Sequence, residues 1–352
     1  MDLLMNTLKK IEKIDYSLDE STQKRLDSLT KPQGSLGILE DIARQVVDIT
    51  KDQYPKMQNK VIFTMAGDHG VAEEGVSAFP KEVTPQMVLN FINGGAGINV
   101  LAGHVGARVI VVDMGVAQDL NVNSSSLKVK KVAYGTKNMA KGPAMTKEEA
   151  VRSIEGGIEA FEDEFSNGID IVGTGDMGIG NTTPSSAITS VITKEAVENV
   201  TGRGTGITDN SLANKIRTIK KSIEVNCPDS KDALDVLAKV GGFEIGGIVG
   251  LILAASSRRV PVVIDGFISG AAALIAYQLE PSVKDYMISA HSSAEKGHRV
   301  IHDYIGLKPL LEFNLRLGEG TGAALGITII EASIKILTEM ATFQSASVPE
   351  KT

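Results

Sequence analysis

The sequence predicts an α/β fold with a mostly parallel sheet and helices on both of its faces. Two observations support this prediction. From about residue 60 onwards, short and almost fully apolar runs alternate with longer helical patterns, as is typical of parallel strands that are covered on both faces. Glycine and polar residues follow the ends of these apolar runs, at the edge where open α/β sheets bind their ligands.

The first fifty residues are predicted to be helical. Apolar residues recur at helical spacing in three segments, and Pro32-Gln-Gly interrupts the pattern between the last two. The predicted helices are Leu3–Ile14, Asp19–Leu29 and Leu36–Thr50. This region carries no chemical motif of its own, so we expect it to pack against the rest of the chain.

Five strands are predicted in the remainder of the chain. Each is rich in β-branched or apolar residues and is followed by glycine, aspartate, histidine or serine. The predicted strands are Val61–Ala66, Arg108–Met114, Ile169–Val172, Val260–Asp265 and Tyr286–Ala290. Their carboxyl ends are the predicted edge of the active site.

Composition excludes several classes of function. A formal net charge of -7 argues against a nucleic-acid or anionic-membrane partner, because such partners need a basic surface. The apolar run Ile245–Ser256 is too short to span a bilayer and is predicted to be a buried helix. The segment Met1–Tyr16 lacks the apolar core of a signal peptide, and the single Cys227 allows no internal disulfide. We therefore expect a cytoplasmic protein.

Glu319 is the most prominent candidate for chemistry. It lies between Gly318 and Gly320, just before an apolar helical pattern, and the two glycines allow a sharp turn that can approach a ligand closely. An acid at the start of a helix can also serve only to stabilise the helix dipole. Position alone leaves the catalytic and the structural interpretation equally open.

Two glycine-rich segments indicate an anionic, phosphorylated substrate. Thr201–Ile207 offers unhindered backbone N–H groups and an arginine, which suit a phosphate. We expect Gly173–Thr183 to form a second turn. The latter contains the G-x-G-x-x-G spacing of dinucleotide sites, but Asp176 would repel a pyrophosphate there and no second strand with a terminal acid follows. The GxxxxGK[ST] motif of nucleotide triphosphate hydrolases is absent.

Aspartate and histidine residues at the strand ends raise the alternative of a metal hydrolase that acts on phosphorylated sugars. The residues concerned are Asp68, His69, Asp113, Asp176, Asp265 and His291. No pair has the close spacing of familiar zinc or two-metal sites. Scattered acids of this kind more often bond to loop backbones or orient substrates, so we expect no metal.

Six motifs in one order resemble the nicotinate-nucleotide:dimethylbenzimidazole phosphoribosyltransferase family, which makes the lower-ligand nucleotide of cobamides. They extend over about residues 20 to 330, so the resemblance covers nearly the whole chain. The motifs are Leu29–Gly37, Ala66–Val71, Gly173–Thr183, Gly202–Gly206, Ser289–Ser293 and Leu317–Gly322. Together they are far more specific than any one of them.

The resemblance implies transfer of 5-phosphoribosyl from nicotinate mononucleotide to 5,6-dimethylbenzimidazole, with α-ribazole 5'-phosphate and nicotinate as products. Glu319 matches the family's general base. Asp176 matches a second acidic position, which could stabilise the positive charge of the reacting sugar. No metal or other cofactor is required, because nicotinate leaves from a nitrogen that already carries a positive charge.

The same matching assigns the binding residues. Those expected to border the base are Phe79, Gln86, Met177 and Leu317, of which Met177 and Leu317 are inferred as apolar walls. Those expected to hold the phosphoribosyl group are Gly178, Gly202, Arg203, Gly204, Lys215 and Ser292.

The resemblance also implies a doubly wound sheet, a homodimer and two domains. The small helical domain is expected from residues 1–55 and about 330–352, and the catalytic domain from 56–329. One alternative remains open: the chain could be a subunit of a heteromeric relative that acts on phenolic or other bases. The preferred base does not follow from the sequence.

Overall fold

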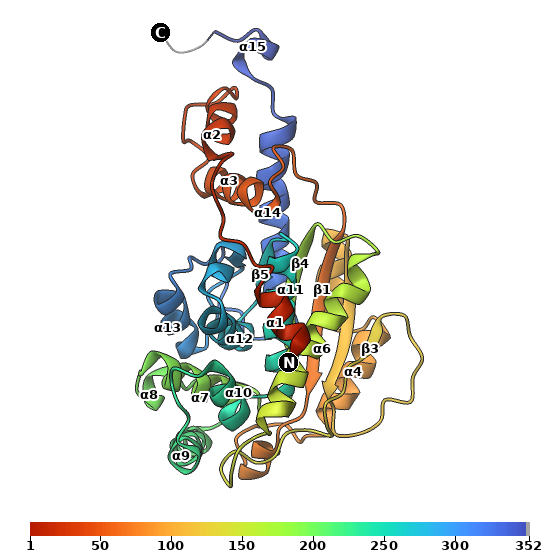
Figure 1. The fold of residues 1–352 in the computed structure, drawn as a ribbon, viewed down its shortest axis with the longest axis vertical. Coiled ribbons are helices and arrows are strands. Elements are labelled where there is room, and N and C mark those ends of the chain that lie inside the picture. Colours follow the sequence, from red (N-terminus) through yellow and green to blue (C-terminus); the bar gives the residue numbers. More distant parts are fainter. Residues whose placement is uncertain (350–352) are drawn as a thin grey trace.

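The computed structural model describes residues 1–349, and its centre is a six-stranded sheet (Figure 1). Every pair of neighbouring strands is parallel. The strand order is β3-β2-β1-β4-β5-β6. Because the order reverses between β1 and β4, a crevice is expected at their carboxyl ends. The strands are β1 (Lys60–Gly67), β2 (Ala107–Gly115), β3 (Leu127–Val129), β4 (Ile171–Met177), β5 (Val262–Ile264) and β6 (Met287–Ser289).

The five predicted strands are present, with two differences. Edge strand β3 was not predicted, because three partly exposed residues give no pattern of their own. Strand β4 continues through Gly173 and Gly175 to Met177, where the sequence predicted a turn. These glycines allow close packing: a Cβ on Gly175 would lie 2.3 Å from the carbonyl oxygen of Glu319, and one on Gly173 would lie 3.1 Å from Ala323 Cβ.

The sheet separates two hydrophobic cores. Successive side chains of a strand point to opposite faces, and β1 follows this rule throughout its buried length. Val61, Phe63 and Met65 belong to one core, whereas Ile62 and Ala66 belong to the other. Both faces are therefore covered, as the apolar strand patterns predicted.

The first core lies under α6 (Lys147–Phe165), α11 (Phe243–Ser257) and α12 (Phe267–Leu279). A capping box starts α6, in which Thr146 and Glu149 exchange side-chain and backbone hydrogen bonds. Helix α11 contains the apolar run that the sequence predicted as a buried helix. Further helical segments around this half are η1 (Gly70–Glu74), α7 (Thr182–Thr193), α8 (Val197–Val200), α9 (Asp209–Asn226), α10 (Ala233–Val240), η2 (Pro281–Tyr286) and α13 (Lys296–Ile305).

The second core lies under α3 (Ile38–Thr50), α4 (Val83–Ile92), α5 (Gly97–Val105) and α14 (Thr321–Glu339). By length and composition, α14 is the one helix within residues 1–349 that could cross a membrane, and 56% of its apolar window is buried inside the fold. It contacts α3, α5 and the central strands. Its first residue, Thr321, directly follows the Glu319 turn. Packing of α14 on the sheet therefore also holds this turn next to the strands.

The helices near the two ends of the chain pack in two different places. Helix α2 (Asp19–Asp27), helix α3 and the last turns of α14 lie together at one end of the molecule, with α15 (Phe343–Ala346) beyond them (Figure 1). Arg25 joins them by donating to the carbonyl oxygens of Leu337 and Met340. Helix α1 (Asp2–Leu8) instead packs on α6 and α11 through Leu4. The predicted boundary near residue 330 falls inside the continuous helix α14, and the two-domain division stays a prediction.

Candidate active site

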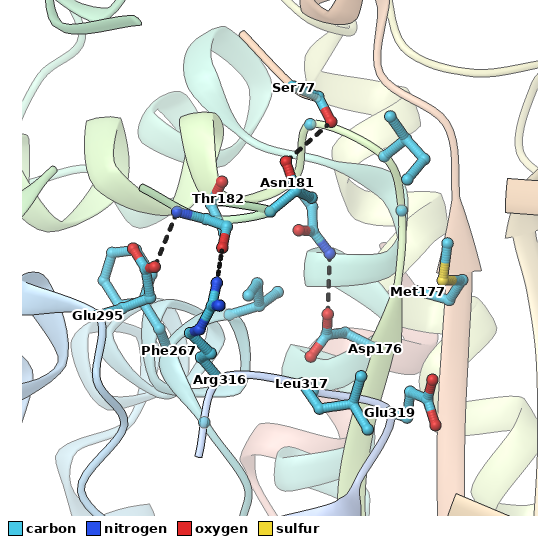
Figure 2. A pocket seen from close by; sticks show the side chains of 18 of the residues that line it. Ser77, Asp176, Met177, Asn181, Thr182, Phe267, Glu295, Arg316, Leu317 and Glu319 are labelled. Carbon is cyan, nitrogen blue, oxygen red and sulfur yellow. Dashed lines mark hydrogen bonds between the residues drawn. The ribbon is translucent and has the colours of Figure 1, made fainter. Parts of the chain in front are cut away.

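A cavity of about 370 Å³ opens at the carboxyl ends of the central strands, next to the point where the strand order reverses (Figure 2). Segments that are far apart in the sequence supply its walls. They include Ser77 and Phe79 after η1, Asp176–Thr182 at and just after the end of β4, Gly204 and Thr205 before α9, and Arg316–Glu319 before α14. His291, Ser293 and Glu295 contribute from the segment after β6. The cavity therefore lies at the edge that the sequence predicted.

Glu319 sits on a tight turn that the sheet holds in place. Gly318, Glu319 and Gly320 have φ angles of +80°, +63° and +101°, which is the left-handed region that favours glycine. The Glu319 N–H donates to the carbonyl oxygen of Asp176 at 3.2 Å, and Thr64 Oγ1 donates to the Glu319 carbonyl oxygen at 2.8 Å. A non-glycine residue held in this conformation by strand hydrogen bonds points to a functional constraint.

Glu319 lines the cavity, and the residue is 5% exposed. Burial raises the pKa of Glu319 above its ordinary value, and the hydrogen bond from the Ile98 N–H partly offsets that rise. A carboxylate with a raised pKa accepts protons more readily than an exposed one. The geometry thus favours the catalytic interpretation of Glu319, because its side chain faces the cavity at the end of β4.

Asp265 secures the segment that follows Glu319. Its carboxylate accepts hydrogen bonds from Gly320 N at 3.2 Å and from Ala323 N at 2.9 Å, which satisfies two backbone donors at the start of α14. Burial raises the pKa of Asp265 to about 7. Asp265 is a positioning residue, since it acts on the Glu319 turn through the backbone.

Asp176 lies at the end of β4, on the same side of the cavity as Glu319 (Figure 2). Its Oδ2 accepts a hydrogen bond from Asn181 Nδ2 at 2.8 Å, and its Oδ1 has no protein partner within the described residues. Burial, followed by the charge of Asp265, raises the pKa of Asp176 well above its ordinary value. Burial therefore favours the protonated form of Asp176, whereas a cation beside it would favour the carboxylate form.

The opposite side of the cavity carries basic groups around Gly204. Lys215 is fully buried and donates from Nζ to Thr182 Oγ1 at 2.6 Å. Burial lowers the pKa of Lys215 to about 8. Arg316 donates from Nη1 to the Gly204 carbonyl oxygen at 3.2 Å, and the Gly204 N–H donates to Glu295 Oε1 at 2.8 Å. Such a set of donors suits a phosphate.

The structure brings most of the predicted site residues to this cavity. Those that line it are Glu319, Asp176, Phe79, Met177, Leu317, Gly178 and Gly204. Lys215 extends from α9 to the loop that contains Gly204. Gly202 and Arg203 line an adjoining pocket of about 470 Å³ on the other side of that loop.

Besides Gly202 and Lys215, three of the predicted residues do not line the main cavity. Gln86 is exposed on α4, about 100° around the helix from Met87, which does line the cavity. Ser292 does not line the cavity, whereas its neighbour Ser293 does. The Ser292 N–H donates to the Leu311 carbonyl oxygen.

The third is Arg203, whose guanidinium donates to the Ile207 carbonyl oxygen at 2.8 Å and pairs with Asp209. Its side chain is thus held on the far side of the loop from the main cavity. Arg316 is the arginine that lines the cavity in its place.

The polar residues of the cavity that sequence reasoning did not assign include Asn181, Thr182, Glu295 and Arg316. Asn181 and Thr182 lie inside the motif Gly173–Thr183, and Arg316 directly precedes Leu317–Gly322. Glu295 follows the serine pair after β6 by two residues. Membership in or next to these motifs was the only sequence signal, and it does not tell which side chains face inwards.

The scattered acids do not form a metal site. Within residues 1–349, no group of three or more His, Cys, Asp or Glu side chains is arranged to hold a metal ion. Asp113 accepts from Val116 N and pairs with Lys131 at 3.1 Å, and Asp68 accepts from Ala117 N. These two aspartates bond to loop backbones, as expected from the sequence.

Comparisons with known proteins agree on one family. A family model described as a phosphoribosyltransferase matches residues 11–348. A nicotinate-nucleotide–dimethylbenzimidazole phosphoribosyltransferase from Geobacter sulfurreducens is 58% identical over 350 residues, which are 99% of each chain. One of the same name from Desulforudis audaxviator is 55% identical over 350 residues, again 99% of each chain.

A solved structure has the same fold over nearly the full length. The crystal structure of CobT from Thermus thermophilus superposes with a TM-score of 0.91 at 40% identity, and the match covers 95% of this chain and 99% of that one. The family model, the curated relatives and the solved structure each match almost all of the sequence. The chain belongs to the nicotinate-nucleotide–dimethylbenzimidazole phosphoribosyltransferase family.

Proposed function

We propose that this protein transfers 5-phosphoribosyl from nicotinate mononucleotide to 5,6-dimethylbenzimidazole in cobamide lower-ligand synthesis. The observation that carries this proposal is full-length membership in a family whose matched relatives bear that activity in their names. The cavity supports the proposal. One side carries acidic and apolar side chains, which suit a cationic sugar and an aromatic base, and the adjoining side carries basic groups, which suit a phosphate. The expected alternative, a subunit that acts on phenols, finds no support among these relatives.

The acceptor base occupies the apolar side of the cavity next to Glu319. Met177 and Leu317 border this side together with Phe79. One ring nitrogen of the benzimidazole attacks the anomeric carbon, and the bond from that carbon to the nicotinate nitrogen breaks. The electron pair of the broken bond stays on nicotinate and neutralises its pyridinium charge. The proton on the other benzimidazole nitrogen passes to the Glu319 carboxylate.

Asp176 stabilises the positive charge that the sugar carries while the old bond breaks and the new one forms. It lies beside the Glu319 turn, and one of its buried carboxylate oxygens has no partner among residues 1–349. Its carboxylate form is favoured when a cationic pyridinium or an oxocarbenium-like sugar lies next to it. Attack from the face opposite nicotinate converts the β-nucleotide into an α-riboside.

Gly204, Lys215 and Gly178 hold the 5'-phosphate on the basic side. Lys215 supplies a buried positive charge, and a charge-assisted hydrogen bond to phosphate is stronger there than in water. Arg316 adds a second positive charge at the rim. This grip fixes the sugar between the leaving nicotinate and the incoming base.

Chromatography of a defined reaction mixture tests the proposal. Purified protein is incubated with nicotinate mononucleotide and 5,6-dimethylbenzimidazole, without added metal. We expect nicotinate and a new riboside phosphate to appear in equal amounts. Formation of neither product, also with adenine or a phenol as acceptor, would reject the proposed activity for the isolated chain.

Three further predictions accompany the proposed function. The protein forms a homodimer, which light scattering after size-exclusion chromatography can establish. The reaction proceeds without a metal ion, which activity in the presence of a chelator can establish. A cytoplasmic location follows from the biosynthetic role and can be checked by cell fractionation.

A further inference from the structure

We propose that the Glu295 carboxylate is a built-in competitor for the phosphate cradle, and that the 5'-phosphate of the substrate displaces it. The phosphate cradle is the donor set formed by Gly204, Lys215 and Arg316. The inference rests on the proposed function, because that function places a phosphate in this cradle. Glu295 belongs to the loop between β6 and α13, far in sequence from Gly204 and Lys215.

Contacts place the Glu295 carboxylate inside the cradle. The Gly204 N–H donates to its Oε1 at 2.8 Å. A Cβ on Gly202 would lie 2.0 Å from its Oε2, so this oxygen rests directly against the backbone of the glycine-rich loop. Glu295 is 6% exposed, and its Oε2 has no partner within the described residues. Figure 2 shows the carboxylate on the same side of the cavity as Thr182 and Arg316.

The charge of the same carboxylate also acts on the lysine of the cradle. Lys215 Nζ lies beside Gly204, since a Cβ on Gly204 would be 3.3 Å from it. Burial lowers the pKa of Lys215, and the charge of Glu295 is the one nearby influence that raises it. A single carboxylate thus provides negative charge to the N–H group and the lysine that would otherwise serve a phosphate.

A phosphate and the Glu295 carboxylate cannot share the cradle. The Gly204 N–H has one hydrogen to donate, and two anions in contact within a buried site repel each other strongly. Binding of the substrate phosphate therefore requires the carboxylate to leave Gly204. The product carries the same 5'-phosphate, so return of the carboxylate also promotes product release.

The structure provides space into which the side chain can move. Glu295 lines both the main cavity and the adjoining pocket of about 470 Å³. Arg203, Lys296 and Arg316 line that second pocket. Arg203 and Lys296, which are not part of the cradle, offer the displaced carboxylate positive charge on the other side of the glycine-rich loop.

Calorimetric titration with inorganic phosphate tests the inference directly. Glu295→Gln keeps the shape of the side chain and removes its charge, so we expect the dissociation constant for phosphate to fall roughly tenfold. Glu295→Ala should give a similar change. Unchanged phosphate binding in both variants would show that the carboxylate does not compete with phosphate. Weaker binding in both would show that Glu295 helps to hold the phosphate. Either result would overturn the inference.

Glu312→Gln is the matched control, since it makes the same charge change at an exposed glutamate outside both pockets. Its phosphate affinity should equal that of the unaltered protein. An equal fall of the phosphate dissociation constant in both glutamine variants would show that only the net charge of the protein matters, and it would overturn the inference. Thermal melting of each variant verifies that it is folded.

A structure of the unaltered protein with bound nicotinate mononucleotide gives a test that needs no variant. We expect the phosphate to bond to Gly204 N, with Glu295 Oε1 beyond hydrogen-bond distance of that atom. A Glu295 carboxylate still bonded to Gly204 beside a bound phosphate would overturn the inference.

These measurements separate the inference from the proposed function. The phosphate titration needs no turnover, so tighter binding in a protein that forms no riboside phosphate would retain the competitor and reject the proposed reaction. Full transferase activity with unchanged phosphate binding in the Glu295 variants would retain the proposed reaction and reject the competitor.

Discussion

The backbone N–H of Ile98 donates a hydrogen bond to Oε2 of Glu319 at 3.1 Å. Ile98 lies in the first turn of α5, where the helix dipole provides partial positive charge. The hydrogen bond orients the carboxylate and limits the rise of its pKa. A helix of the second core thus determines the direction of the group that is proposed to take the proton.

Replacement of Glu319 by glutamine should lower turnover by a factor of about 10² to 10⁴. The amide oxygen can still accept the Ile98 hydrogen bond, so we expect the fold and substrate binding to persist. Steady-state kinetics and calorimetric binding of nicotinate mononucleotide measure the two effects separately. Turnover close to that of the unaltered protein would show that Glu319 is not the base.

Asp176 should release a proton when a cationic substrate binds. Its raised pKa favours the protonated form, whereas the pyridinium charge of nicotinate mononucleotide favours the carboxylate. Calorimetry in buffers of different ionisation enthalpy measures the protons released. We expect release in the unaltered protein and much less in Asp176→Asn, which should also turn over more slowly. Identical release in both would assign the proton to another group.

Binding of nicotinate mononucleotide should weaken as the pH rises above about 8, the value to which burial lowers the pKa of Lys215. The sign follows from the charge. Protonated Lys215 attracts the phosphate, whereas the neutral amine formed above this pH does not. Since the phosphate is already dianionic from about pH 7, its own ionisation does not cause the loss.

Lys215→Met is the variant that checks this assignment. It should bind nicotinate mononucleotide weakly, and its affinity should change little between about pH 7 and about pH 9. Dissociation constants measured across this range for both proteins decide the matter. A pH dependence that persists in the methionine variant would point to a different titrating group.

Gly175→Ala should disturb the Glu319 turn. The new Cβ would lie 2.3 Å from the Glu319 carbonyl oxygen, so we expect a loss of about 1 to 3 kcal/mol in the free energy of unfolding together with lower activity. Gly103→Ala is the control, since a Cβ there meets no atom within 4 Å inside helix α5. That variant should be as stable as the unaltered protein or slightly more stable by chemical denaturation. Equal stability in Gly175→Ala would contradict the predicted clash.

Local patterns were sufficient to predict the sheet and the edge at which the cavity lies. Apolar runs predicted β1, β2, β4, β5 and β6, because strands buried on both faces need apolar side chains throughout. The residues after these runs indicated the cavity, since the carboxyl ends of parallel strands meet at one edge. The glycines around Glu319 likewise indicated its turn, because the backbone there has positive φ angles.

Packing between distant segments decided the rest, and no local pattern contains it. Gly173 and Gly175 were interpreted as a turn, but they continue β4 because the Glu319 turn and α14 approach the strand closely. Gln86 lies on the exposed face of α4, so its side chain does not reach the cavity, and an ion pair with Asp209 holds Arg203 away from it. The contact between Glu295 and Gly204 joins residues 91 positions apart. Side-chain direction and long-range contact depend on the whole folded chain, so they follow only from its tertiary structure.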